Sequence, residues 1–248
     1  QYVVQLADST LLPCFPRGKK SEVACGDRVD IQRTSDDQGV IEAMQPRTSL
    51  LYRSYEIKQK LVAANVDQFV IVVASEPGFS DELVTRALLA AESEEIEPLI
   101  VLNKCDLSER VPAARAQLAV FAALGYRIVE LSARDHAEDL RPELFGYTSV
   151  LVGQSGMGKS TLVNALVPDA GAATREISAA LNSGKHTTTH ATLYHLDADS
   201  ELIDSPGLQE FGLGHLDRQD VEHAFREFRP YLGQCRFRDC HHDREPDC

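Results

Sequence analysis

The chain has 248 residues and a formal net charge of −13 at pH 7, with 25 Lys and Arg against 38 Asp and Glu. This length accommodates one substantial α/β core and two small attachments, and the acidity argues against a protein that coats nucleic acid indiscriminately. No apolar run approaches membrane-spanning length and no charged-then-apolar leader opens the sequence, so we expect a cytoplasmic protein with no membrane contact.

Residues 1–57 are predicted to form short strands separated by turns, at 2–6, 28–31 and 39–43 among others. Spacing of this kind favours a small β-barrel, which we interpret as an OB-fold. Because the sequence starts inside an apparent strand, we expect part of the barrel to precede it. The basic segment 17–20 is a candidate nucleic-acid contact, and a solvated charged loop explains it equally well.

Strand and helix patterns alternate in the middle of the chain. Strands are predicted at 68–74, 98–102 and 126–131, and helices at 80–91 and 112–124. Ser80 is the expected cap of the first helix, while proline in the first turn and Gly125 after the end delimit the second. The alternation predicts a mainly parallel sheet with helices on both faces.

A guanine-recognition motif follows the second of these strands: Asn103, Lys104, Cys105 and Asp106. The Asp106 carboxylate can accept hydrogen bonds from guanine N1–H and the exocyclic amine, a donor pair that adenine lacks. Ser132 and Ala133, after the strand at 126–131, resemble the segment whose backbone contacts guanine O6. Taken alone, the tetrapeptide is also typical of a solvated helix start.

A phosphate loop comes later in the chain, after the apolar residues 149–152, and a helix-forming run continues it at 161–166. It consists of Gly153, Gln154, Ser155, Gly156, Met157, Gly158, Lys159 and Ser160, followed by Thr161. Its amides can surround a β-phosphate at a helix N-terminus, Lys159 can neutralise β/γ charge during catalysis, and Ser160 can ligate magnesium. A glycine-rich turn that only starts a helix is the alternative.

The order of these two motifs is the reverse of the order in ordinary GTPases, which indicates a circularly permuted GTPase. Two further elements follow where permutation would place them. Asp204 ends a strand at 201–203 and is expected to hold magnesium through water, while the Gly207 amide is expected to sense the γ-phosphate.

The run 184–189 is typical of a first switch, in which one threonine, with Thr188 as the candidate, reaches magnesium. Leu208 occupies the position of the glutamine that orients water in Ras-like GTPases, so intrinsic hydrolysis should be slow. His186 is the candidate catalytic group, and a solvated or RNA-contacting histidine explains it equally well.

The C-terminal segment carries three thiols and an imidazole at Cys235, Cys240, His242 and Cys248. This set suits tetrahedral zinc, and four protein ligands make the predicted site structural. His242 is preferred to His241 because His241 adjoins the ligand Cys240. A helix at 218–228 is expected to lead into this module, and a further helix is expected after Cys248.

Together these features resemble the family of small ribosomal subunit-dependent GTPases (RsgA or YjeQ). The resemblance implies an OB-fold barrel (1–57), a circularly permuted P-loop GTPase domain (58–216) and a zinc-binding domain (217–248). It also implies slow hydrolysis of GTP to GDP, stimulated by the small (30S) subunit during its late maturation. The expected partners are GTP or GDP with magnesium and 16S rRNA, with no DNA, and the expected state is a monomer.

The distribution of charge fits this division. Residues 61–216 carry 10 Lys and Arg against 22 Asp and Glu, whereas residues 1–60 carry 9 against 8. The flanking regions are therefore better suited than the acidic middle to contact rRNA. Two alternatives remain open: a GTPase that acts on the large subunit or another RNA, and a non-enzymatic RNA-binding zinc protein, which Leu208 favours.

Overall fold

A computed structural model describes residues 1–18, 23–55, 58–171, 191–205, 213–214 and 216–248. The predicted switch residues His186, Thr188, Gly207 and Leu208 lie outside these ranges. Among the described residues, no helix is both long and apolar enough to cross a bilayer.

The central element is a six-stranded sheet in the order β11-β12-β10-β7-β8-β9. Its strands are β7 (Gln68–Ala74), β8 (Glu97–Asn103), β9 (Arg127–Glu130), β10 (Thr148–Val152), β11 (Thr192–His195) and β12 (Glu201–Asp204). All neighbours are parallel except the edge pair β11 and β12, as expected for the predicted α/β fold.

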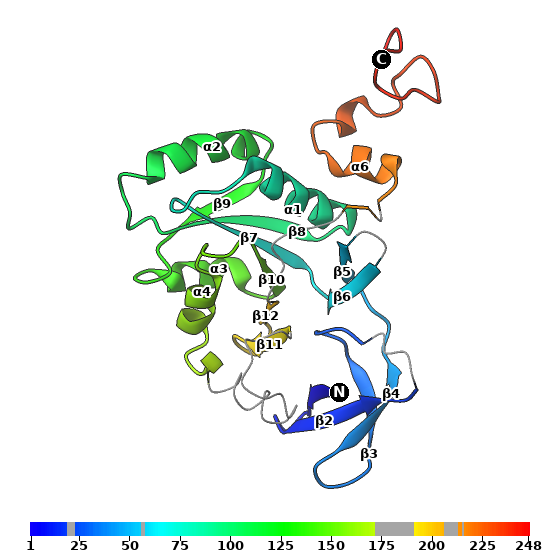
Figure 1. Ribbon diagram of the computed structural model, residues 1–248, viewed down its shortest axis with the longest axis vertical. Coiled ribbons are helices and arrows are strands. Elements are labelled where there is room, and N and C mark those ends of the chain that lie inside the picture. The colour runs from blue at the N-terminus through cyan, green and yellow to red at the C-terminus, as the bar shows by residue number, and fades with distance from the viewer. Residues whose placement is uncertain (19–22, 56–57, 172–190, 206–212, 215) are drawn as a thin grey trace.

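Helices cover both faces of this sheet, which confirms the predicted fold class (Figure 1). Helices α1 (Asp81–Ser93) and α2 (Val111–Ala123) cover one face, and η1 (Ala137–Leu140), α3 (Arg141–Leu144) and α4 (Lys159–Leu166) cover the other. Alternate residues of β7 point to opposite faces: Phe69, Ile71 and Val73 pack with α1 and α2, while Val70 and Val72 pack with α3 and α4. Every residue of β7 is buried, as in a strand covered on both sides.

The helix boundaries differ slightly from prediction. Ser80 occupies the N-cap position of α1, but its side chain makes no capping hydrogen bond, so the predicted cap is wrong in its chemistry. The residue after α2 is Leu124, and Gly125 then adopts the left-handed backbone conformation (φ 83°) expected at a helix end.

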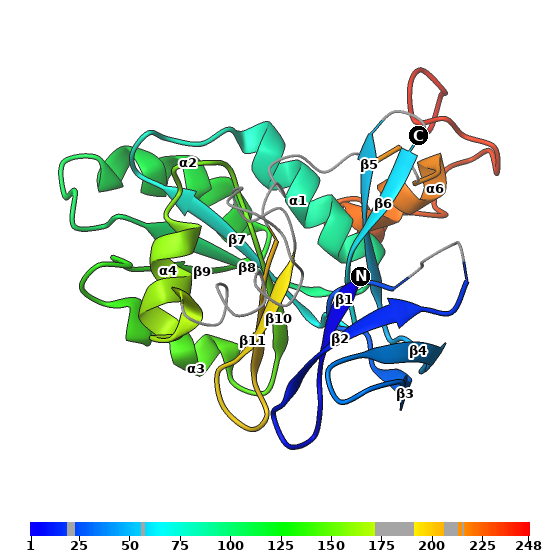
Figure 2. The same cartoon turned by 60° about the horizontal axis from the view of Figure 1, so that its bottom comes forward.

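The N-terminal region forms a smaller sheet with strand order β1-β2-β4-β3. Its strands are β1 (Tyr2–Gln5), β2 (Leu11–Pro16), β3 (Val29–Arg33) and β4 (Gly39–Met44), with β2 and β4 parallel. Leu12, Cys14 and Ile41 form its own small core. Figure 2 shows this sheet beside the β11 edge of the large sheet, where Gln5 Oε1 lies 2.8 Å from His195 Nε2.

A separate hairpin of β5 (Leu50–Tyr55) and β6 (Lys58–Ala64) connects the two sheets. It pairs residues on both sides of the domain boundary predicted at 57/58. The packing is tight where the N-terminal region approaches β6: a Cβ added to Gly26 would lie 2.3 Å from the Ala64 carbonyl oxygen. The N-terminal region therefore packs directly against the hairpin as well as being connected to it by the chain.

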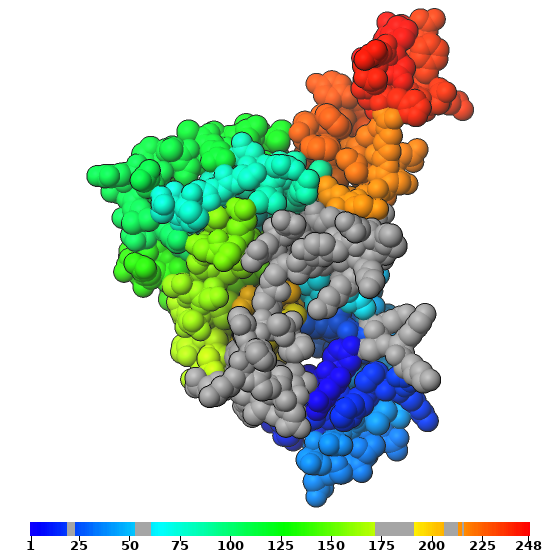
Figure 3. All heavy atoms as spheres, in the orientation of Figure 1, coloured from blue at the N-terminus to red at the C-terminus, as the bar shows by residue number. Residues whose placement is uncertain are grey.

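The C-terminal segment begins with α6 (Arg218–Ala224) and continues through η2 (Arg229–Tyr231). A capping box between Asp217 and Asp220 starts α6. The helix predicted to reach Phe228 ends at Ala224, because Phe225 adopts an extended backbone (φ −77°, ψ 110°). The last residues project from the body of the molecule (Figure 3).

Candidate functional site

The predicted nucleotide-binding residues gather at one edge of the large sheet. The guanine motif starts on the last residue of β8, Ser132 and Ala133 follow β9, the phosphate loop follows β10, and Asp204 ends β12. These strands are parallel, so their carboxyl ends meet at the same edge. In the sheet, β8 and β9 follow on one side of β7, whereas β12 and β11 lie on the other side of β10. The strand order therefore reverses between β7 and β10, and ligands bind at such a switch point in open α/β sheets.

Asn103 connects three of these segments through its buried side chain, which is 1% exposed. Its Nδ2 donates to the Met157 carbonyl oxygen at 2.8 Å, and its Oδ1 accepts from the amides of Ala133 at 2.9 Å and Lys104 at 2.7 Å. One side chain thus positions the phosphate loop, the guanine motif and the segment after β9 relative to one another. The Ala133 amide belongs to the segment, Ser132 and Ala133, whose backbone is predicted to contact guanine O6, and it donates to Asn103 in this structure.

Two glycines allow the phosphate loop to fit against its neighbours. A Cβ on Gly158 would lie 2.2 Å from Asn103 Nδ2, and one on Gly153 would lie 2.3 Å from the Val72 carbonyl oxygen. Both have positive φ, at 94° and 142°. Any side chain at either position would combine a disfavoured backbone with a steric clash.

Lys159 and Asp204 bring opposite charges to the loop. Lys159 Nζ donates to the carbonyl oxygens of Gly153 at 2.6 Å and Gln154 at 2.8 Å. Burial lowers the pKa of Lys159 and raises the pKa of Asp204, while their mutual attraction opposes both shifts. The effect of burial on the pKa is the larger one for both residues, so a bound group of opposite charge would stabilise the charged form of each.

The remaining site residues lie nearer the solvent. Ser155, Gly156, Ser160 and Thr161 are exposed, and Asp106 is exposed at the guanine motif. The Ser160 hydroxyl and the Asp204 carboxylate are the oxygen ligands that magnesium prefers, so the donor set fits that ion. Burial of Cys105 raises the pKa of its thiol and favours the neutral form.

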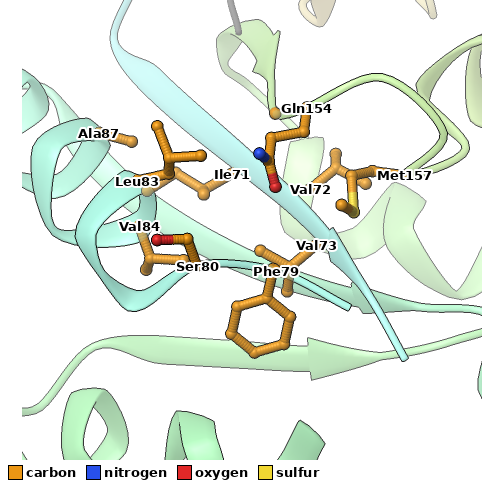
Figure 4. Close-up of a pocket in the computed structure, with 11 residues that line it drawn as sticks. Ile71, Val72, Val73, Phe79, Ser80, Leu83, Val84, Ala87, Gln154 and Met157 are labelled. Atoms are coloured by element: carbon orange, nitrogen blue, oxygen red, sulfur yellow. The ribbon is translucent and has the colours of Figure 1, made fainter. Parts of the chain in front are cut away.

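An apolar pocket borders the phosphate loop on the α1 side (Figure 4). Ile71 and Val73 of β7, Phe79, Leu83 of α1, and Gln154 and Met157 of the loop line it, among others. The first turn of α1 therefore shares an apolar surface with the phosphate loop.

The four predicted metal ligands form a cluster at the C-terminus. The ligand atoms of Cys235, Cys240, His242 and Cys248 all lie within 4.8 Å of one another, so this cluster could hold a metal ion. His242 Nδ1 lies 3.5 Å from Cys235 Sγ and 3.3 Å from Cys248 Sγ. His241 turns away, and its Nδ1 contacts the guanidinium of Arg218.

The sequence did not identify Glu222, whose Oε2 lies 3.5 Å from His242 Nε2. A carboxylate on the far nitrogen of a ligating histidine fixes the ring orientation. Nor did it identify Glu92 at the end of α1, which accepts from Arg226 Nε at 2.5 Å and from an Arg229 nitrogen at 2.6 Å. Their partners lie 20 and more than 130 positions along the chain, so no local spacing could have revealed them.

Comparison with known proteins shows clear relatives. Residues 44–214 match the family described as RsgA GTPase. The "Small ribosomal subunit biogenesis GTPase RsgA" of Burkholderia pseudomallei (strain K96243) is 59% identical over 252 residues, which cover 100% of this chain and 80% of that protein. The protein of the same name from Nitrosospira multiformis is 53% identical over 247 residues, covering 100% of this chain and 79% of the relative.

Two solved structures share the fold. YjeQ from Thermotoga maritima superposes with a TM-score of 0.71 at 31% identity and covers 98% of this chain and 82% of its own. YloQ, described as a circularly permuted GTPase, superposes with a TM-score of 0.67 at 28% identity and covers 97% of this chain and 78% of its own. The similarity extends over the N-terminal sheet, the large sheet and the C-terminal segment.

Proposed function

The chain belongs to the RsgA GTPase family, and from this premise we propose that it hydrolyses GTP to GDP and phosphate in the biogenesis of the small ribosomal subunit. The observation that carries the proposal is the contact of Asn103 with both Met157 and Ala133. It supports a single nucleotide site in which guanine recognition and phosphate binding are held together despite the permuted chain order.

Each part of this site has a proposed task. The Asp106 carboxylate accepts hydrogen bonds from guanine N1–H and from the exocyclic amine. The Ala133 amide donates to guanine O6 as well as to Asn103 Oδ1. The amides of residues 153–161 bind the phosphates, and Lys159 stabilises charge on the β/γ bridge. Ser160 and, through water, Asp204 would hold magnesium, and the bound ion would supply electrostatic stabilisation of the transferred phosphoryl group.

The switch residues complete the proposal. In the triphosphate state Thr188 would help to hold magnesium and the Gly207 amide would contact the γ-phosphate. Because Leu208 can neither orient nor activate water, intrinsic turnover is slow, and His186 together with the ribosomal partner completes the site.

The cluster of Cys235, Cys240, His242 and Cys248 binds one structural zinc ion in this proposal. Three thiolates and one imidazole suit tetrahedral zinc and leave no coordination position open for substrate. The near-neutral N-terminal region and the C-terminal module contact 16S rRNA, while the acidic GTPase domain limits nonspecific binding. Because the proposed partner is a ribosomal subunit, the proposed site of action is the cytoplasm.

The test is steady-state hydrolysis by the purified protein alone, with small subunits, and with large subunits, using ATP as the control nucleotide. Strong stimulation of GTP hydrolysis by the small subunit alone supports the proposal. Equal or greater stimulation by the large subunit, or none by either, contradicts it. The Lys159→Ala variant controls for contaminating hydrolases, because it should lose activity under every condition.

A further inference from the structure

Ser75 is the first residue after β7, and its hydroxyl contacts the guanine motif on the neighbouring strand. The side chain is buried, at 8% exposure. Its Oγ donates to the Lys104 carbonyl oxygen at 3.0 Å, and its amide donates to the Asn103 carbonyl oxygen at 3.3 Å. Ser75 therefore extends the β7–β8 ladder by one residue and adds a side-chain bond at its end.

The Lys104 carbonyl that receives this bond also closes the turn that carries Asp106. It accepts a second hydrogen bond from the Leu107 amide at 3.0 Å, which encloses Cys105 and Asp106 in a four-residue turn. The Cys105 amide donates at 3.1 Å to the carbonyl oxygen of Leu131, the residue after β9, and fixes the middle of the turn there. The orientation of the Lys104 carbonyl group, together with the bond to Leu131, thus sets the position of Asp106.

Lys104 adopts a left-handed backbone conformation, with φ of 62°. This conformation is disfavoured for a residue with a long side chain, so it persists only where its surroundings hold it. The residues after β7 do so at two points, because Lys104 Nζ also donates to the Glu76 carbonyl oxygen at 2.8 Å. Ser75 holds the backbone of Lys104, and Glu76 holds its side chain.

We propose that Ser75 is a positioning residue for guanine specificity, which sets the turn that presents Asp106 to the base. It does not touch the nucleotide; it acts through the Lys104 carbonyl. The inference rests on the proposed assignment of Asp106 to guanine.

The test compares equilibrium affinities for GDP and IDP, which lacks the exocyclic amine, in the full chain. The wild type should prefer GDP. Ser75→Ala should lower GDP affinity by about tenfold and IDP affinity much less, so that the GDP/IDP ratio falls. Ser75→Thr, which keeps the hydroxyl, should restore the ratio. An equal loss for both nucleotides would indicate a merely structural role and overturn the inference.

A second measurement isolates the route through Lys104. Glycine tolerates the left-handed conformation, so in a Lys104→Gly background the Ser75→Ala change should alter the GDP/IDP ratio by no more than about twofold. A full-sized effect there would overturn the inference. If Ser75→Ala does not fold, Ser75→Cys replaces it as a weaker donor, and an unchanged ratio would overturn the inference.

The design separates this inference from the proposed function. A wild type with no preference for GDP over IDP contradicts the assignment of Asp106 and with it the inference. A wild type that prefers GDP, with an unchanged ratio in Ser75→Ala, contradicts the role of Ser75 alone.

Discussion

The Asn103 side-chain amide donates a hydrogen bond to the Met157 carbonyl oxygen at 2.8 Å, although 54 positions separate the two residues. Met157 is 2% exposed, so the bond is sheltered from water. The end of β8 and the phosphate loop are thereby held in fixed register. Circular permutation changes the order in which the chain builds these segments and leaves this contact in place.

Replacing Asn103 should therefore weaken both folding and binding. In Asn103→Ala, the Met157 carbonyl and the Ala133 amide lose their side-chain partner, and the cost should be about 2–4 kcal/mol of unfolding free energy. GDP affinity should fall at least about tenfold, because the phosphate loop and the segment after β9 are no longer held in position by the Asn103 side chain. Urea denaturation and GDP titration measure these effects. Asn164→Ala, at an exposed position of α4, is the control and should change neither quantity.

The close approach at Gly158 predicts a second sensitive position. In Gly158→Ala the new methyl group would lie 2.2 Å from Asn103 Nδ2, so either the loop or Asn103 must shift. Gly78→Ala is the matched control, because Gly78 has nearly the same φ (93°) but no atom within 4 Å of the added Cβ. Both variants should lose about 1–2 kcal/mol of unfolding free energy, because alanine disfavours the left-handed backbone conformation. Only Gly158→Ala should lose nucleotide affinity. Similar affinity losses in the two variants would contradict the steric explanation.

The sequence predicted what depends on local pattern. The apolar run at 69–74 in β7 and the glycines at 153, 156 and 158 specify a buried strand and a phosphate loop from their own neighbourhoods. The contacts of Asn103, Ser75 and Glu92 could not be predicted, because each depends on which strand or helix end lies beside it. The predicted end of α6 was wrong for a related reason. The helical pattern in the sequence continues to Phe228, but the helix ends at Ala224, and Arg226 and Arg229 beyond it both pair with Glu92.

Glu92 should hold the C-terminal segment against the GTPase domain. Its side chain is 9% exposed and pairs with both arginines, and the Arg226 guanidinium also lies 4.0 Å from the centre of the Tyr126 ring. Glu92→Gln removes the charge from this contact, and amide hydrogen exchange in residues 218–231 should accelerate by about tenfold. Glu82→Gln is the control on the same helix, because it alters only an exposed pair with Arg86. Equal exchange rates in the two variants would show that the Glu92 contacts do not hold the segment.

The two neighbouring histidines should differ in their effect on metal binding. His242→Ala removes a ligand from the cluster, so the zinc content of the purified protein, measured by mass spectrometry, should fall well below one ion per chain. His241→Ala should retain the metal, because His241 faces Arg218. Glu222→Gln should bind zinc about tenfold more weakly than the wild type. Retention of zinc by His242→Ala and its loss from His241→Ala would reverse the assignment.

Asp204 should make stability depend on pH in a defined direction. Burial raises its pKa in the folded state above the value of 3.8, so between 3.8 and the raised pKa the folded chain binds more protons than the unfolded one. Ionisation of Asp204 therefore lowers the unfolding free energy as pH rises through this window, and above the window the destabilisation reaches its full size. Asp204→Asn removes the titration, so its unfolding free energy minus that of wild type should increase with pH from 4 upward. The buried Lys159, left without its carboxylate partner, adds a constant to this difference without changing its slope at acidic pH.

Asp197 provides a control of opposite sign. Hydrogen bonds from the backbone of Asp199, together with others from Ser200, lower the pKa of Asp197, so its contribution to stability is present above 3.8 and is lost as pH falls through the lowered pKa. Asp197→Asn minus wild type should therefore decrease as pH rises through the acidic range. Denaturant unfolding between pH 3 and 7, without added magnesium or nucleotide, measures both slopes. If the stability differences of the two variants changed with pH in the same direction, burial would not govern the titration of Asp204. The interpretation of Asp204 as a carboxylate that burial destabilises and a bound cation would stabilise would then be wrong.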